Sequence, residues 1–226
     1  VALATSFEWL RAARVSRVDM TLTFFLYGAL LLFAVMDRTG VTRGRRFAFY
    51  ACLALATLGK GPVGIALPAI LVIAYGMLSP PSPEPGSGGS VQIGARFRST
   101  LAMLRRLEPI PGLTAVLLVT GAWYVAALVV GGEEFFVKQI LKENIYRVLA
   151  PERLDSGHRH DAFYLIPQFL LGALPWSLMA PAVGWWLWRS RPLDRTIRFL
   201  LVWFVGTIAL FSLSASKRSV YILPAY

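Results

Sequence analysis

The sequence predicts an all-α integral membrane protein, and three observations support this fold class. Of the 226 residues, 56% are hydrophobic and 15% are charged, whereas about 25% of the residues in a typical soluble domain are charged. Apolar stretches long enough to cross a bilayer alternate with short polar segments. The arginines cluster in those segments, so the net charge of +11 indicates membrane topology and not a nucleic-acid-binding face.

Six apolar stretches are expected to form membrane spans or half-spans. The second and third would otherwise be one run of about 32 residues, longer than the ~17–25 residues of an ordinary span. The turn Gly59-Lys60-Gly61-Pro62 divides this run, because proline cannot continue the helical hydrogen-bond ladder. Pro175 and Pro181 are expected to interrupt the fifth stretch. The stretches are 20–36, 47–59, 63–78, 113–130, 163–187 and 199–213.

Amphipathic and flexible segments connect these stretches. Residues 1–19 are expected to form a helix lying at the membrane interface, because arginines recur there every three residues. Residues 79–111 combine a linker rich in Pro, Gly and Ser with a basic helix. The outer loop 131–161 is expected to contain an amphipathic helix over 133–148. We expect 1–226 to be part of a single membrane domain, with segments missing at both ends, because the chain begins at Val1 without a methionine.

The charge distribution predicts which loops share a side of the membrane. Loops 37–46, 79–111 and 188–198 contain twelve arginines, no lysine and four acidic residues, a net charge of +8. The segments that alternate with them carry a net charge of +3 and all four lysines. The positive-inside rule therefore places the first set in the cytoplasm, and the lysines on the opposite face.

Two of these lysines abut long apolar stretches and have no acidic residue nearby in the sequence. The turn around Lys60 brings its amine to the bilayer edge, where backbone N–H groups at the next helix start also favour an anion. Ser216-Lys217-Arg218 places two further cations beside hydroxyl groups. We interpret both motifs as contacts for a lipid phosphate; the alternative is that they only anchor the helices at the interface.

Other polar residues on the same face are candidates for a substrate pocket. Arg14 and Asp19 precede the first span and form either a ligand-facing cluster or ordinary anchoring charges. In the outer loop, Arg147 is the preferred candidate, on a helix face that is otherwise solvated. His158 and His160 have a spacing that can ligate zinc. One such pair without a third ligand predicts no metal site, so we interpret them as hydrogen-bonding or substrate-facing residues.

These motifs, in this order along nearly the whole chain, resemble those of the dolichyl-phosphate-mannose protein mannosyltransferase superfamily. The resemblance is greatest to its bacterial branch, which includes the aminoarabinose lipid A transferases. Singly each motif is common, whereas the ordered set is specific. The matching residues are Ala13, Arg14, Asp19, Leu58, Lys60, Gly61, Pro62, Pro68, Glu143, Asn144, Arg147, His160, Phe163, Tyr164, Pro175, Trp176, Ser177, Ser216, Lys217, Arg218, Tyr221, Ile222, Leu223 and Pro224.

The resemblance implies a GT-C fold, a polytopic bundle with amphipathic helices on its outer face. It implies an inverting glycosyltransferase of the bacterial inner membrane, which moves a sugar from a polyprenyl-phosphate donor to a lipid, glycan or protein acceptor on the non-cytoplasmic side. Membrane lipids would be further partners, and nucleic acid would not. The residues it implies are Lys60, Arg147, Lys217 and Arg218 for the donor phosphate, and Arg14, Asp19, Glu143, Asn144, His160 and Tyr221 for the substrate pocket.

The resemblance assigns neither a catalytic base nor a metal site to residues of this chain. The family's catalytic aspartate lies in an outer loop upstream of this chain, so Asp19 is not taken as the base. Asn144 stands where the lipid A branch carries a metal-associated histidine, which argues against a bound metal; a divalent cation stays an alternative without an assigned ligand set. Two other functions stay open: a transporter or flippase that binds lipid phosphate without chemistry, and a non-catalytic scaffold with partner-binding outer loops.

Overall fold

The computed structural model describes residues 1–15, 18–79, 92–137, 161, 163–213 and 217–226. Among these residues the secondary structure is entirely helical. The elements in chain order are α1 (Ala2–Thr5), α2 (Phe7–Ala13), α3 (Val18–Thr39), α4 (Arg43–Lys60), α5 (Val63–Leu78), α6 (Gln92–Arg106), α7 (Pro109–Phe135), α9 (Leu165–Gly172), η4 (Trp176–Met179), α10 (Ala180–Arg189), α11 (Arg195–Leu213) and η5 (Ser219–Ala225).

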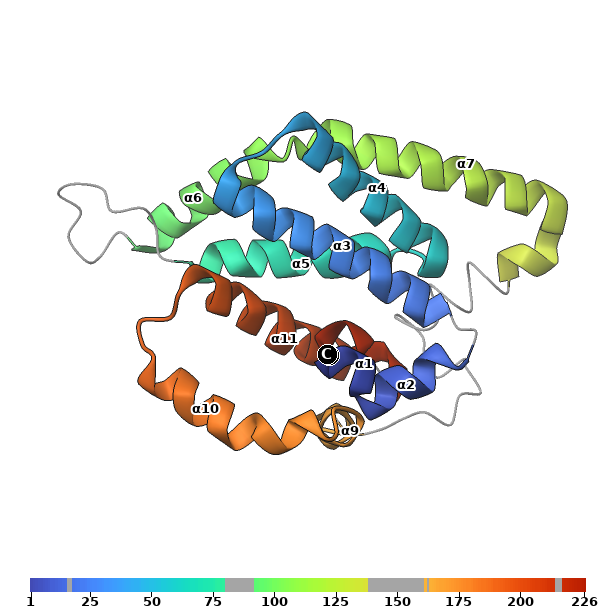
Figure 1. Ribbon diagram of the computed structural model, residues 1–226. Helices are drawn as coiled ribbons and strands as arrows, with labels where there is room; N and C mark the ends of the chain where they lie inside the picture. Colours follow the sequence, from blue (N-terminus) through green and yellow to red (C-terminus); the bar gives the residue numbers. More distant parts are fainter. Residues whose placement is uncertain (16–17, 80–91, 138–160, 162, 214–216) are drawn as a thin grey trace.

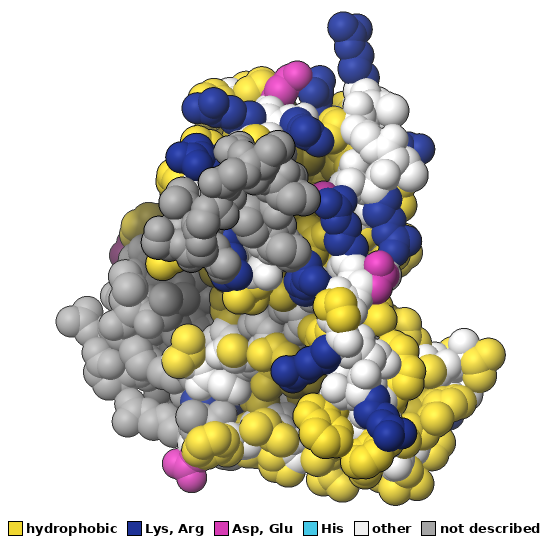
Figure 2. Space-filling model, turned by 90° about the vertical axis from the view of Figure 1, so that its left-hand side faces the viewer, with side chains coloured by type: hydrophobic (Ala, Val, Ile, Leu, Met, Phe, Trp, Pro, Cys, Tyr) yellow, Lys and Arg dark blue, Asp and Glu magenta, His cyan; other side chains and the backbone are white. Residues whose placement is uncertain are grey.

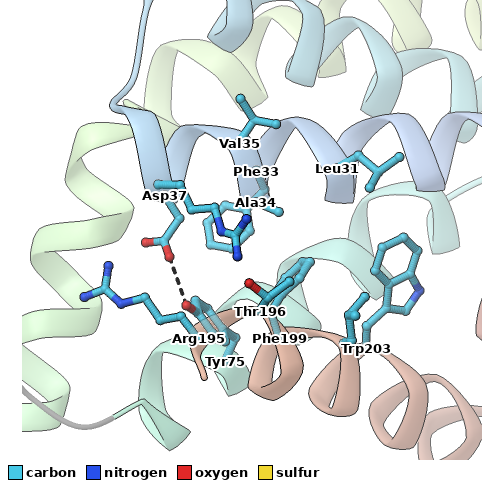
Figure 3. A pocket seen from close by; sticks show the side chains of 12 residues that line it. Leu31, Phe33, Ala34, Val35, Asp37, Tyr75, Arg195, Thr196, Phe199 and Trp203 are labelled. Atoms are coloured by element: carbon cyan, nitrogen blue, oxygen red, sulfur yellow. Dashed lines mark hydrogen bonds between the residues drawn. The ribbon is translucent and has the colours of Figure 1, made fainter. Parts of the chain in front are cut away.

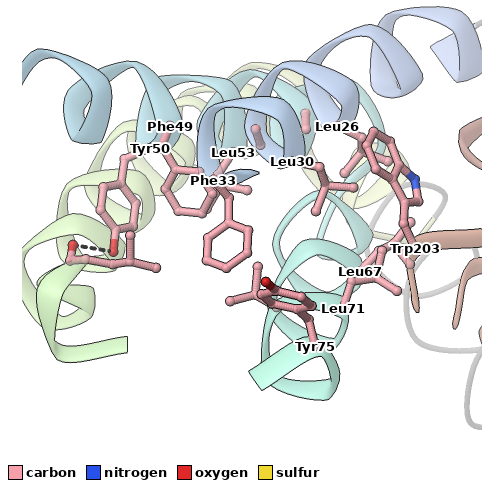
Figure 4. Packing of buried hydrophobic residues seen from close by; sticks show 14 of the residues in the cluster. Leu26, Leu30, Phe33, Phe49, Tyr50, Leu53, Leu67, Leu71, Tyr75 and Trp203 are labelled. Carbon is pink, nitrogen blue, oxygen red and sulfur yellow. Dashed lines mark hydrogen bonds between the residues drawn. The ribbon is translucent and has the colours of Figure 1, made fainter. Parts of the chain in front are cut away.

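Helices α3, α4, α5 and α11 form the centre of a bundle (Figure 1). The helix α7 packs on α4, α6 packs on the end of α5, and η5 packs against α3 and α11. Figure 4 shows the core that they enclose, in which Leu26 and Leu30 of α3 meet Leu67 and Leu71 of α5. These four side chains have no exposed surface. Burial of the facing apolar stripes thus holds the central helices together.

A tight turn joins α4 to α5 at the place where the sequence predicts a break. Gly61 has a φ of 77°, in the left-handed region that favours glycine. Three residues later, a Cβ on Gly64 would lie 2.4 Å from the backbone nitrogen of Thr57. Only a glycine allows α5 to approach α4 this closely. The turn is therefore rigid, and it fixes the position of Lys60.

The predicted spans correspond to helices, and two points of detail stand out. Three helices, α3, α7 and α11, are long and apolar enough to cross a membrane, and α5 is a shorter apolar helix of 16 residues. The helix α4 begins at Arg43 and not at residue 47, because the side chain of Thr42 caps its first turn by accepting from the N–H of Arg45 (3.4 Å). The predicted interruption of the stretch 163–187 is confirmed, and it is a sharp one: α9 and the η4–α10 segment are bent by 108°.

The amphipathic segments also differ from the prediction in detail. Residues 1–15 form two short helices that meet at Ser6, so the single interfacial helix predicted over 1–19 is wrong. The basic helix predicted over 95–107 is α6. The helix predicted over 133–148 begins inside α7, where Gly132 adopts a non-helical φ of 54°. The remainder of that segment lies outside the described residues.

The two ends of the bundle carry different charges, as the loop alternation predicts. At one end, the guanidinium of Arg46 contacts the carboxylate of Glu108 (2.6 Å), and Arg38 lies 3.9 Å from Asp194. Figure 2 views this end, and basic side chains are scattered over it with few acidic ones. The starts of α3 and α5 and the ends of α4 and α11 lie at the other end (Figure 1). This second end, which we call the lysine end, contains Lys60 and Lys217.

Candidate functional site

An ion pair between Lys60 and Asp19 is the centre of the lysine end. Lys60 is the last residue of α4 and Asp19 is the second residue of α3, so the antiparallel packing of the two helices brings them together. The Lys60 Nζ atom donates to Asp19 Oδ1. The side chains are 21% and 12% exposed, respectively. The expectation that Lys60 has no acidic partner is therefore wrong: its partner comes from a neighbouring helix, not from nearby sequence.

The ring of Tyr221 forms a second wall around the same amine. The Lys60 Nζ atom lies 4.3 Å from the ring centroid of Tyr221, a distance at which a cation is attracted by the face of an aromatic ring. Tyr221 is 7% exposed and packs against Phe211 of α11, with the two ring centroids 5.7 Å apart. The contacts of the amine thus include a carboxylate from α3 and an aromatic face from η5.

Lys217 lies just before η5 and is buried, with 6% of its surface exposed. The neighbouring Arg218 is exposed. The C-terminal segment that carries both is fixed in the bundle, because Trp203 Nε1 donates to the carbonyl oxygen of Pro224 (2.7 Å) and Ile222 is fully buried. Since Tyr221 follows Lys217 by four residues and contacts Lys60, η5 brings the two predicted lysine motifs to the same end.

A second polar network, which the sequence analysis missed, links α2 to η5. Arg11 Nη2 donates to Glu8 Oε1 (2.6 Å) and to Ser219 Oγ (2.9 Å), and Ser219 Oγ donates to the same Glu8 oxygen (3.2 Å). Glu8 is only 4% exposed. The hydrogen bond to Glu8 raises the pKa of Arg11. The three-residue spacing of Glu8 and Arg11 was the available signal.

The other predicted site residues are placed differently or not described. Arg14 ends α2 as its C-cap and is exposed, and the ion pairs of the described residues do not include it. It is therefore not joined to Asp19 in the predicted cluster. Glu143, Asn144, Arg147, His158 and His160 lie outside the described residues. In the described part of the chain, no three His, Cys, Asp or Glu side chains gather as a metal site would require.

Comparisons with known proteins identify the relatives of this arrangement. No family model matches the chain. A protein of Aquifex aeolicus without an assigned function is 29% identical over 99% of this chain and 39% of its own length. An undecaprenyl phosphate-alpha-4-amino-4-deoxy-L-arabinose arabinosyl transferase of Aeromonas hydrophila is 26% identical over 93% of this chain and 35% of its own length.

Two solved structures of an aminoarabinose transferase are similar to this chain in fold. The crystal structure of ArnT from Cupriavidus metallidurans bound to undecaprenyl phosphate matches 99% of this chain with a TM-score of 0.74 and 25% sequence identity. The same protein in the apo state matches with a TM-score of 0.72. The chain is similar to the aminoarabinose transferases along nearly its whole length, and it has the GT-C fold of ArnT.

These matches support the predicted resemblance and the predicted GT-C fold. The chain spans 37% of the matched ArnT structure, and so corresponds to part of such a protein. Three described helices are long and apolar enough to cross a membrane, which fits the predicted multi-pass location in the bacterial inner membrane. That the lysine end faces the periplasm stays a prediction of the charge distribution. The individual site residues are not tested by these matches, and they are treated below as proposals.

Proposed function

We propose that the protein containing this chain is an inverting glycosyltransferase that takes its sugar from a polyprenyl-phosphate donor at the periplasmic face. The observation that carries this proposal is the structural match, along 99% of the chain, to ArnT bound to undecaprenyl phosphate. The curated relatives with assigned names are transferases, which favours transfer over a transporter or a scaffold. Lipid, glycan and protein acceptors fit the proposal, and lipid A is the first to test.

The proposed reaction is attack by an acceptor hydroxyl or phosphate oxygen on the anomeric carbon of the donor. The new glycosidic bond forms as the bond from that carbon to the phosphate oxygen breaks, so polyprenyl phosphate leaves with the electron pair. Negative charge develops on the leaving phosphate, where fixed cations stabilise the transition state. An acidic residue upstream of this chain would accept the proton of an acceptor hydroxyl.

Lys60, Lys217 and Arg218 are proposed to hold the donor phosphate, together with Arg147 from the outer loop. The Asp19 pairing of Lys60 is compatible with this role, because the carboxylate fixes the position of the amine at the lysine end. In the proposal, Asp19 orients Lys60 toward the phosphate. Tyr221 supports the amine from its other side. Glu143, Asn144 and His160 remain proposed acceptor-side residues.

The full-length protein with radiolabelled polyprenyl-phosphate sugar tests the proposal. The wild type should release free polyprenyl phosphate only when an acceptor is present, and the label should appear on that acceptor. Lys60→Ala should lower kcat/KM for the donor by about tenfold to a hundredfold, the loss expected when a charged hydrogen bond of ~1.5–3 kcal/mol is removed.

The control is Arg98→Ala, which removes an exposed cation of α6 at the opposite end. It should leave kcat/KM unchanged. Movement of labelled donor across a vesicle membrane without acceptor-dependent release would support the transporter alternative and contradict the proposed transfer.

A further inference from the structure

A cavity of about 210 Å³ lies at the arginine-rich end of the bundle, between α3, α5 and α11 (Figure 3). Its walls are apolar except at one end, and the lining includes the aromatic side chains of Phe33, Phe199 and Trp203. It lies at the opposite end of the helices from Lys60, the end that the charge distribution predicts to be cytoplasmic, so the donor phosphate does not explain it.

The cavity opens sideways toward the hydrocarbon of the bilayer. Three apolar side chains on its rim are exposed in the bundle: Leu31 and Val35, one helical turn apart on α3, and Leu200 on α11. They are 55%, 42% and 51% exposed. Both helices are long enough to cross the membrane, so this opening faces the region that lipid chains occupy.

Charged groups line only the cytoplasmic end of the cavity. Arg38 is the last residue of α3 that lines the cavity, and Arg195 is the first residue of α11 that does so. The carboxylate of Asp37, which precedes Arg38, also lines this end and accepts from the hydroxyl of Tyr75 (2.9 Å). Figure 3 shows Asp37 and Arg195 at one end of the cavity and Leu31 and Trp203 toward the other.

The two arginines remain available to a ligand at this end. Arg38 lies 3.9 Å from Asp194, with both side chains more than half exposed, and an exposed pair at that distance is weak. The ion pairs among the described residues do not include Arg195, and its side chain is exposed. Trp203 follows Arg195 by eight residues on α11. At ~1.5 Å per residue, the lining therefore extends ~12 Å along the helix into the membrane.

We propose that this cavity binds one acyl chain of an anionic phospholipid of the cytoplasmic leaflet, whose phosphate lies between Arg38 and Arg195. The change from charged to apolar lining along the helix axis matches the change from headgroup to chain in a lipid. Basic pockets between membrane helices on the cytoplasmic side suit such headgroups. The proposal does not depend on the glycosyl transfer proposed above.

The test is native mass spectrometry of the full-length protein titrated with phosphatidylglycerol or phosphatidylcholine in detergent. Arg38→Gln combined with Arg195→Gln should weaken the first phosphatidylglycerol site about 30-fold, equivalent to about 2 kcal/mol at ~1 kcal/mol per basic side chain. Ala34→Leu, which fills the cavity from α3, should weaken it as well while keeping both charges. The matched control, Arg98→Gln combined with Arg105→Gln, removes two exposed α6 charges that do not line the cavity.

Selective loss in the two cavity variants, with the control unchanged and the unfolding temperature without lipid preserved, supports the proposal. Equal weakening in the control would show that a diffuse surface charge binds the lipid, and would overturn it. Equal retention of phosphatidylcholine, or no retained lipid on the wild type, would also overturn it. In the last case, another helix of the protein would be the occupant of the groove.

Discussion

Trp203 donates its indole N–H to the carbonyl oxygen of Pro224, 2.7 Å away, and so joins the middle of α11 to the segment that carries Lys217. Both residues are buried. Pro224 lies in η5, whose first residues follow directly on Lys217 and Arg218. The position of the proposed phosphate-binding cations thus depends on a hydrogen bond made within the bundle.

Replacing Trp203 by Phe is expected to lower the free energy of unfolding by about 1–3 kcal/mol, because the buried Pro224 carbonyl loses its partner. Thermal unfolding in detergent measures the change. Trp188→Phe is the control, since Trp188 is 64% exposed and should have an effect below about 0.5 kcal/mol. Equal effects of the two substitutions would contradict a specific role for the bond.

A double-mutant cycle tests the coupling between Lys60 and Asp19. Each of Asp19→Asn and Lys60→Met alone should destabilise the protein, because each leaves a mostly buried partner without its counter-charge. The double variant should lose less stability than the sum of the losses in the two single variants, by about 1–2 kcal/mol. Additive effects would show that the pair contributes no coupling.

The glycine at position 64 is expected to be irreplaceable. A Cβ there would lie 2.4 Å from the Thr57 backbone nitrogen, and backbone atoms cannot move aside without separating α4 from α5. Gly64→Ala should therefore cost several kcal/mol, at or above the upper end of the ~1–3 kcal/mol typical of overpacking, and lower the affinity for the donor by shifting Lys60.

Two other glycines provide graded controls for this prediction. A Cβ on Gly206 would also lie at 2.4 Å, but from the end of the flexible Leu71 side chain, which can rotate away. A Cβ on Gly184 of α10 would have no neighbour within 4 Å. We expect the unfolding temperature to be highest for Gly184→Ala, lower for Gly206→Ala and lowest for Gly64→Ala. A different order would contradict the role of backbone contact.

Arg11→Ala is expected to destabilise the link between α2 and η5, because it leaves the buried Glu8 carboxylate without its cation. In a Glu8→Gln background the same substitution should have a much smaller effect, since the neutral amide needs no counter-charge. The measurement is the unfolding temperature of the two single variants and the double variant. Equal effects of Arg11→Ala in both backgrounds would exclude this explanation.

The sequence predicted the helices well because apolar stretches and proline positions report them directly. The break at Gly59-Lys60-Gly61-Pro62 is local chemistry, and it was placed correctly. The direction of the bend between α9 and η4 depends on packing against α2 and η5, so Pro175 indicated an interruption without indicating 108°. The capping of α4 by Thr42 was a readable signal that was not used.

The site was less predictable, because its central contact joins residues 41 positions apart in the chain. No acidic residue lies near Lys60 in the sequence. The loop alternation had nevertheless placed Asp19 and Lys60 on the same face, and a hairpin of α3 and α4 makes their meeting a consequence of topology. The role of Glu8 could not be derived in this way, since it depends on where the C-terminal segment folds back.

The carboxylate beside Lys60 has a consequence for selectivity. A small inorganic anion such as chloride has to compete with the Asp19 carboxylate for this amine, so we expect dissolved anions to bind it weakly. A lipid-borne headgroup brings its own tether in the membrane and overcomes this competition through its high local concentration. The carboxylate would then act as a filter that admits anchored anions and turns away dissolved ones.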